Sequence, residues 1–281
     1  MRSHQLSRRR FVLLSAASAA GLNAEPKQPI PIGLQQTAVV RELQRDFDGT
    51  IRAIAGMGYD LIEFSANTFM TWTPARAKEV RALMDGVHLR CRSTHNEIVS
   101  FSGDGLSRSI ELNHILGSDT IVSVRGPGSP TAPPSLDPWK RFSDQLSQAA
   151  NRIRAANMTL GFHNHDVEFK TLEATRPIDI LAANNDITSF HLNIGLCLKG
   201  GGDPVAFIRQ CPGRIQTLLI QDYMGKAKWP EILTAAEKTG GLQFYLIQRT
   251  DGLSLVPREG DDVLEFARKD LQLFRQMHRL T

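Results

Sequence analysis

The chain has 281 residues, of which 41% are hydrophobic and 22% are charged, and it contains three cysteines. This length and composition indicate one large globular domain and exclude a disordered chain or a small disulfide scaffold. There are 33 basic and 29 acidic side chains, but four arginines lie in the first 24 residues, so 29 of each remain beyond them. That balance excludes a surface built for nucleic acid or for an anionic membrane.

The first 24 residues are predicted to be an export signal. Arg8, Arg9 and Arg10 precede a short apolar run over residues 11–20, and small residues follow as far as Ala24. This order is typical of a twin-arginine signal that is cleaved near Ala24. The apolar run is shorter than the roughly 20 residues that a membrane span needs. We therefore expect residues 25–281 to form the mature domain, in the periplasm or outside the cell, without membrane attachment.

From residue 30 onward, short apolar runs alternate with amphipathic segments of helical length. Strands are predicted over residues 30–34, 60–64, 89–94, 120–124, 159–162, 187–192, 215–220 and 243–247. Helices are predicted over residues 47–57, 74–84, 106–116, 138–156, 177–183, 204–210, 229–239 and 263–277. Thr73, Asp137 and Asp203 each precede a proline and are expected to cap the helix that follows.

Eight strand–helix pairs in about 250 residues predict an α/β fold, a single-domain (β/α)8 TIM barrel. An open doubly wound sheet is the alternative, but no Gly-x-Gly-x-x-Gly turn follows the first strand. Cys91, Cys197 and Cys211 match no metal-ligand spacing and are expected to be buried free thiols, with one disulfide as the alternative. Residues 126–137 form the longest connection, either a lid over the barrel mouth or a surface loop.

The active site of such a barrel lies at the carboxyl ends of the strands. The richest strand end is the fifth, where residues 160–169 read LGFHNHDVEF. Two histidines and a glutamate at this spacing, His163, His165 and Glu168, can hold a metal ion or move protons. Other polar side chains at strand ends are candidates for contacts to a substrate: Glu63, His95, Asn193, Asp222 and Gln248.

In four segments the chain resembles the xylose isomerase-like TIM barrels, in particular the bacterial sugar phosphate isomerase/epimerase group. These segments are residues 58–64, 161–169, 201–204 and 212–215, in this order and spacing. The resemblance runs from about residue 30 to the C-terminus. It implies a carbohydrate substrate and a divalent metal, Mn²⁺, Zn²⁺, Mg²⁺ or Co²⁺, held by residues of strands five to eight. It also implies proton transfer next to a sugar carbonyl.

The sequence departs from the pattern of this group at the expected metal ligands. Asn193 stands where the group usually has Asp, Leu219 where it has His, and Gln248 where it has Glu. An amide offers a dipole in place of a charge, and an alkyl side chain cannot coordinate at all. The three substitutions argue that the metal chemistry of the group is weakened or absent. Two alternatives for the cofactor follow: a divalent metal, or no metal.

The leading hypothesis is an exported sugar isomerase/epimerase-like protein that moves a proton next to a carbonyl. His163, His165 and Glu168 are its predicted catalytic residues and its predicted metal ligands. One alternative is a catalytically silent relative that binds a carbohydrate or a partner protein. Another is a keto-sugar lyase or hydratase, because elimination also begins with loss of a proton beside a carbonyl. A DNA-repair endonuclease of the same barrel class is disfavoured, because it would need a fuller metal cluster and a basic groove and the sequence shows neither.

Overall fold

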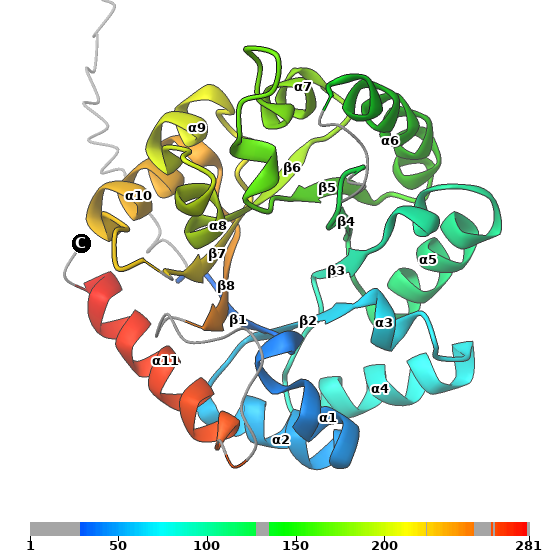
Figure 1. Cartoon of the computed structure of the whole chain (residues 1–281). Coiled ribbons are helices and arrows are strands. Elements are labelled where there is room, and N and C mark those ends of the chain that lie inside the picture. The colour runs from blue at the N-terminus through cyan, green and yellow to red at the C-terminus, as the bar shows by residue number, and fades with distance from the viewer. Residues whose placement is uncertain (1–28, 128–134, 223, 250–259, 261, 280–281) are drawn as a thin grey trace, which may run out of the picture.

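The computed structural model describes residues 29–127, 135–222, 224–249, 260 and 262–279. Eight parallel strands close into a barrel in chain order, which confirms the predicted (β/α)8 fold. In Figure 1 the strands form the inner ring and the helices surround them. The strands are β1 (Ile32–Gln35), β2 (Leu61–Ser65), β3 (Ser93–Asn96), β4 (Thr120–Ser123), β5 (Thr159–His163), β6 (Ser189–Asn193), β7 (Thr217–Gln221) and β8 (Phe244–Arg249).

The helices that cover the barrel include every segment predicted as helical. They are α2 (Phe47–Met57), α4 (Pro74–Gly86), α5 (Gly103–Leu116), α6 (Asp137–Ala155), α7 (Pro177–Ala183), α9 (Pro204–Gln210), α10 (Trp229–Ala235) with the π-helical turn η4 (Ala236–Gly240), and α11 (Val263–Arg279). Shorter helical segments at the mouth were not predicted, because three to six residues show no helical period. They are η1 (Gln36–Val39), α1 (Val40–Arg45), α3 (Ala66–Phe69), η2 (Ile98–Phe101), η3 (Val167–Phe169) and α8 (Ile194–Lys199).

Two of the three predicted helix caps are confirmed. Thr73 accepts a hydrogen bond from the backbone N–H of Arg76, and Asp203 accepts from two backbone N–H groups of α9. The prediction for Asp137 is wrong. α6 begins at Asp137 itself, and its carboxylate lies 3.1 Å from Lys140 Nζ instead of capping the helix.

The predicted and observed strand boundaries differ most at β3. The prediction started this strand at residue 89, but residues 89–92 make only an isolated bridge, Leu61 to Arg90, before regular pairing begins at Ser93. The three cysteines are buried free thiols, as predicted. None of the helices in the described ranges is long and apolar enough to cross a membrane. The predicted signal, residues 1–24, and most of the predicted lid, residues 128–134, lie outside the described residues.

The apolar core has two parts. The larger lies between the strands and the surrounding helices. The smaller contains Leu61, Leu219, Phe244 and Leu246; Leu61 lies two residues before Glu63 on β2 and so shares its face, which is the face toward the barrel interior. The bottom of the barrel is consequently filled with hydrocarbon, and the polar side chains lie above it, toward the mouth.

Gly33 of β1 leaves room for this inner cluster. A Cβ at this position would lie 2.7 Å from Leu246 Cδ2 and 2.8 Å from Leu61 Cβ, whereas a Cβ at Gly56 of α2 would meet nothing within 4 Å. We expect Gly33→Ala to lower the free energy of unfolding by about 1–3 kcal/mol through overpacking. Gly56→Ala should be neutral or raise it by about 0.4–1 kcal/mol. Urea unfolding of both variants checks this, and equal effects would contradict it.

Candidate functional site

A cavity of about 190 Å³ opens at the mouth of the barrel. Three imidazoles reach it from β3 and from the end of β5: His95, His163 and His165. The remaining wall carries amide or hydroxyl groups from Gln35, Thr37, Ser65, Asn67 and Gln248, together with the charged side chains of Glu97 and Arg125. A second cavity, of about 260 Å³, lies beside it and shares His165 and Arg125 with the first. The predicted catalytic histidines therefore do lie at an accessible site.

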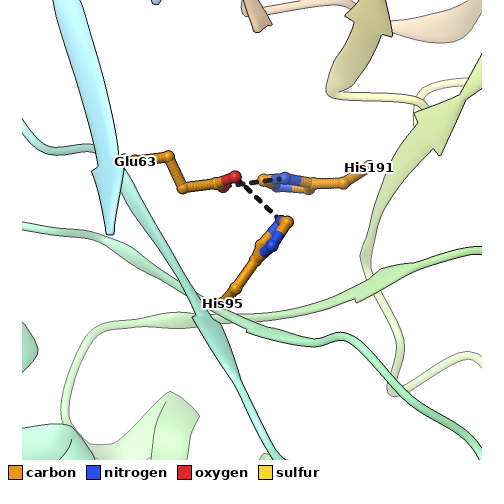
Figure 2. Close-up of side chains that lie close together, drawn as sticks. All are labelled: Glu63, His95 and His191. Carbon is orange, nitrogen blue, oxygen red and sulfur yellow. Dashed lines mark ion pairs between the residues drawn. The ribbon is translucent and has the colours of Figure 1, made fainter. Parts of the chain in front are cut away.

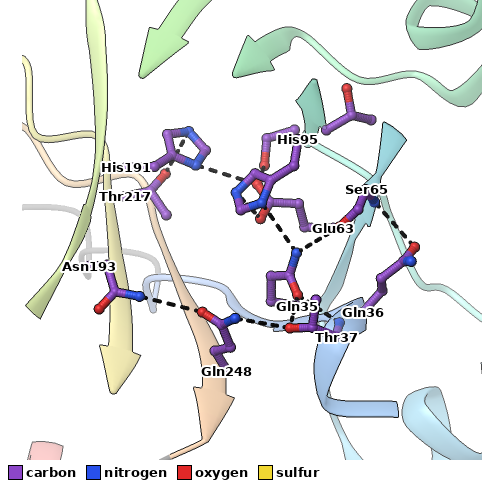
Figure 3. A network of polar contacts seen from close by, with 12 residues as sticks. Gln35, Gln36, Thr37, Glu63, Ser65, His95, His191, Asn193, Thr217 and Gln248 are labelled. Atoms are coloured by element: carbon purple, nitrogen blue, oxygen red, sulfur yellow. Dashed lines mark hydrogen bonds and ion pairs between the residues drawn. The ribbon is translucent and has the colours of Figure 1, made fainter. Parts of the chain in front are cut away.

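Neutral amides form a hydrogen-bonded chain across this mouth (Figure 3). Asn193 Nδ2 donates to Gln221 Oε1 at 2.7 Å and to Gln248 Oε1 at 3.4 Å. Gln248 Nε2 donates to Thr37 Oγ1 at 2.9 Å, and that hydroxyl donates to Gln35 Oε1. The chain links β6, β7 and β8 to β1, so the last strands and the first share one polar network.

Gln35 connects the amide chain to the histidines. Its Nε2 donates to Ser65 Oγ at 3.1 Å and lies 3.3 Å from His95 Nδ1. Since Gln35 Oε1 already accepts from the backbone N–H and the hydroxyl of Thr37, the amide nitrogen faces the ring. This arrangement makes His95 Nδ1 an acceptor and leaves the ring proton on Nε2.

The residues at the usual metal positions of strands five to eight do not fit a metal ion. Asn193 Oδ1 accepts from the backbone N–H of Leu196 at 2.9 Å, and Gln248 Oε1 accepts from Asn193. Leu219 packs in the inner apolar cluster and offers no donor atom. Only His163 remains as a strong ligand, so we derive no step through a metal at this place.

His163 and His165 lie next to each other at the end of β5, but Glu168 contacts only the backbone there. The two rings are 5.2 Å apart and nearly perpendicular. Glu168 is buried in η3, and its Oε2 accepts from the backbone N–H of His165 at 2.7 Å. The structure thus brings these three residues together without gathering their ligand atoms into a metal cluster. Their predicted catalytic and metal-binding roles stay predictions.

Burial sets the charge state of these groups. It lowers the pKa of His163 well below the usual range and, together with the nearby Arg125, lowers the pKa of His165 to about 4. Both rings are therefore neutral at neutral pH. Burial raises the pKa of Glu168 to about 7, against the hydrogen bonds to its carboxylate. A group with a pKa near 7 is well placed to exchange protons under ordinary conditions.

Beneath the mouth, a buried carboxylate lies between two imidazoles (Figure 2). Glu63 Oε2 lies 2.8 Å from His95 Nε2, and Glu63 Oε1 lies 3.4 Å from His191 Nδ1. Ser93 Oγ donates to Glu63 Oε1 at 2.5 Å. Burial alone would raise the pKa of Glu63, but His95 and His191 outweigh it and hold that pKa well below the usual range. Glu63, His95 and His191 are also a set that could hold a divalent metal.

The other predicted substrate contacts divide into two kinds. His95 and Gln248 line the mouth cavity, and Asn193 is one hydrogen bond from it. Asp222 instead organises the loop after β7, because its carboxylate accepts backbone N–H bonds from Met224, Lys226 and Ala227. Glu63 lies behind His95 and is not part of the cavity wall.

Two residues of this network, Gln35 and His191, are not among the residues predicted from the sequence, and Gln221, although it ends a strand, was not predicted as a substrate contact. Gln35 ends a strand that the prediction stopped one residue early. Gln221 ends β7 beside Asp222, and its Nε2 is buried without a hydrogen-bond partner. His191 lies two residues before Asn193 and so faces the same side of β6. The alternation of strand residues was the signal that could have identified it.

No protein-family model matches the chain. Solved structures do superpose on most of it. A sugar phosphate isomerase/epimerase from Parabacteroides distasonis ATCC 8503 is 20% identical, with a TM-score of 0.72 over 90% of this chain and 97% of that one. A D-psicose 3-epimerase from Clostridium cellulolyticum H10 is 15% identical, with a TM-score of 0.66 over 88% and 99%. A probable 3-DHS dehydratase from Bacillus anthracis is 14% identical, with a TM-score of 0.62 over 88% and 99%.

These neighbours are sugar phosphate isomerase/epimerase and xylose isomerase-like TIM barrel proteins, the group that the sequence motifs resemble. At such identities the likeness shows the fold.

Glu168 predicts a pH-dependence of stability. Its pKa is about 7 in the folded protein and returns to about 4.5 on unfolding. Between these values the folded state binds more protons, so stability conferred by this group is present below about pH 4.5 and lost as the pH rises through 7. We expect Glu168→Gln to remove this loss and to be more stable than the parent at pH 8 by on the order of 3 kcal/mol.

Urea unfolding at pH 5 and pH 8 measures this difference. The exposed Glu231→Gln is the matched control and should keep the parent's pH-dependence. The expectation is wrong if Glu168→Gln loses stability between the two pH values as much as the parent does.

Proposed function

We propose that this protein binds a small carbohydrate at the mouth of the barrel and moves a proton next to its carbonyl group. One observation carries the proposal: the 190 Å³ cavity combines neutral imidazoles with a wall of amides and hydroxyls. Amides and hydroxyls both donate and accept hydrogen bonds, which suits the hydroxyls of a sugar. The cavity is smaller than the roughly 300–1,000 Å³ that drug-sized ligands occupy, so it suits a ligand of monosaccharide size.

His163 and His165 are the residues that we assign to proton transfer. Both reach the cavity, and a neutral imidazole can take up a proton from carbon or pass one to oxygen. Gln35 and Gln248 are placed to bind substrate hydroxyls. Glu168 fixes the backbone of His165, and its ionisation near pH 7 changes the charge beside that ring. We therefore assign it a positioning role. No step in this scheme requires a metal.

Exchange of substrate hydrogen with solvent deuterium tests the proposal. D-fructose and D-tagatose are incubated with the protein in D2O, and NMR follows deuterium uptake at the carbons next to the carbonyl. We expect the parent to catalyse exchange and His163→Gln to reduce it by at least about 100-fold, the lower range for a lost acid–base group. His114→Gln, an exposed histidine of α5, should behave as the parent. Equal rates in His163→Gln and the parent would overturn the assignment.

A binding role without turnover is the second candidate. The observation that favours it is the amide chain of Asn193, Gln221 and Gln248, which carries no charge where a charged ligand set is usual for the resembled group. Sugar-induced thermal stabilisation of the parent without deuterium uptake would support this candidate. Deuterium uptake with formation of a dehydrated product would instead support a keto-sugar lyase.

Export through the twin-arginine pathway is also proposed, from Arg8, Arg9 and the apolar residues that follow them. In a bacterial host with this pathway, the parent should appear in the periplasm, shortened near Ala24. Arg8→Lys together with Arg9→Lys should keep the full-length chain in the cytoplasm. Fractionation and mass spectrometry of the intact protein measure both. Normal processing of the double variant would contradict the proposal.

A further inference from the structure

The polar interior below the mouth holds a carboxylate that forms no ion pair with a Lys or Arg of the described residues. Glu63 has an exposed fraction of 1%, and its ion-pair partners among the described residues are His95 and His191. A buried carboxylate without a compensating positive charge is strongly destabilising. The charge is therefore removed by a proton on the carboxylate itself, or balanced by a proton on one of the two imidazoles or by a bound cation.

The atoms that face one another lack aligned hydrogen bonds. Glu63 Oε2, His95 Nε2 and His191 Nδ1 are all buried without a hydrogen-bond partner, although the carboxylate is 2.8 Å from one ring and 3.4 Å from the other. A proton on a ring nitrogen reaches only one acceptor and needs a nearly linear path to it. An ion placed among the three atoms would satisfy all of them together.

The distances and donor types match a divalent transition metal. One ligand atom from each of the three residues lies within 4.8 Å of the others. Ligands in a tetrahedral zinc site, with bonds of about 2.0–2.1 Å, are roughly 3.3 Å apart, so small movements of these side chains suffice. Two imidazoles and one carboxylate are a donor set preferred by Zn²⁺, Co²⁺ and similar ions over Mg²⁺.

Each of the three side chains also has a polar contact with a neighbouring residue outside the set. Ser93 Oγ donates to Glu63, and Thr217 Oγ1 lies 3.3 Å from His191 Nε2. Gln35 lies 3.3 Å from His95 Nδ1. An acceptor for the second ring N–H, such as Thr217 Oγ1 beside His191, fixes the ring orientation in metal sites. Metal binding at His95 Nε2 requires the ring proton to lie on Nδ1, so the Gln35 side chain must then turn its amide oxygen toward the ring in place of its nitrogen.

We infer that Glu63, His95 and His191 form a binding site for one divalent transition-metal ion, on strands β2, β3 and β6. This position differs from that of the ligands on strands five to eight that the resemblance implies. It also differs from the predicted set of His163, His165 and Glu168. The site shares His95 with the wall of the mouth cavity, but the proposed sugar chemistry needs no metal, so either proposal can fail without the other.

Cobalt binding to the full-length protein tests the inference. The protein is freed of metal with a chelator and titrated with Co²⁺, whose visible absorption reports coordination by nitrogen and oxygen, and Zn²⁺ is then added in competition. We expect one equivalent of Co²⁺ that Zn²⁺ displaces. Glu63→Gln and His191→Gln should each weaken binding by at least about 100-fold, more than the roughly 10–100-fold effect of an orienting partner.

Three further variants test whether Co²⁺ binding depends on the proposed set of residues. Thr217→Val, which removes a partner of His191, should weaken binding by about 10-fold. His165→Gln and the exposed His114→Gln should bind Co²⁺ as the parent does. Glu63→Gln preserves the shape of the side chain, and circular dichroism checks that the variants are folded. Absence of stoichiometric binding, or binding that survives Glu63→Gln and His191→Gln, would overturn the inference. Loss in His165→Gln would also overturn it, in favour of the β5 set.

Discussion

The negative charge of Glu63 is the constraint on which the barrel interior depends. The carboxylate lies above the apolar cluster that contains Leu61 and Leu219, where a lone charge is unfavourable. Two imidazoles and one hydroxyl surround it, and no ion pair with Lys or Arg is found among the described residues. Whether a proton or a metal ion balances this charge determines the hydrogen-bond donors and acceptors in the layer above.

The layer above consists largely of neutral amides that hydrogen-bond to one another, although Gln221 Nε2 is buried without a partner. A series of hydrogen bonds runs from Asn193 through Gln248 and Thr37 to Gln35. Gln35 in turn contacts His95. Asn193 also caps α8. Such a network tolerates little change, because each amide serves two neighbours and a lost partner leaves a buried polar group unpaired. Asn193 and Gln248, at two of the positions where the resemblance implies metal ligands, are therefore parts of one hydrogen-bonded network, whereas Leu219 belongs to the apolar cluster below.

The fold could be predicted in detail because strand and helix periods are local properties of the sequence. α2, α7 and α9 have the predicted boundaries, and Thr73 and Asp203 cap their helices as expected. The cap at Asp137 was wrong by one residue, since Leu136 precedes the helix and sequence pattern does not resolve such a shift.

The site was only partly predictable. His163, His165 and Gln248 were recognised as strand-end residues and do line the cavity. The pairing of Glu63 with His191 joins residues on β2 and β6, which are not neighbours in the barrel. It depends on how side chains from opposite walls meet in the interior, and no local pattern in the sequence records that meeting.

The pairing of β1 with β8 closes the barrel and affects the order in which the protein folds during its synthesis. Leu34 pairs with Ile247, and Thr37 accepts a hydrogen bond from Gln248, contacts that span more than 200 residues of chain. The first strand therefore remains without its second neighbour until nearly the whole polypeptide has left the ribosome. Contacts of such long range form slowly and leave strand edges exposed in the meantime. The polar network at the mouth should accordingly be among the last parts of the molecule to assemble during synthesis.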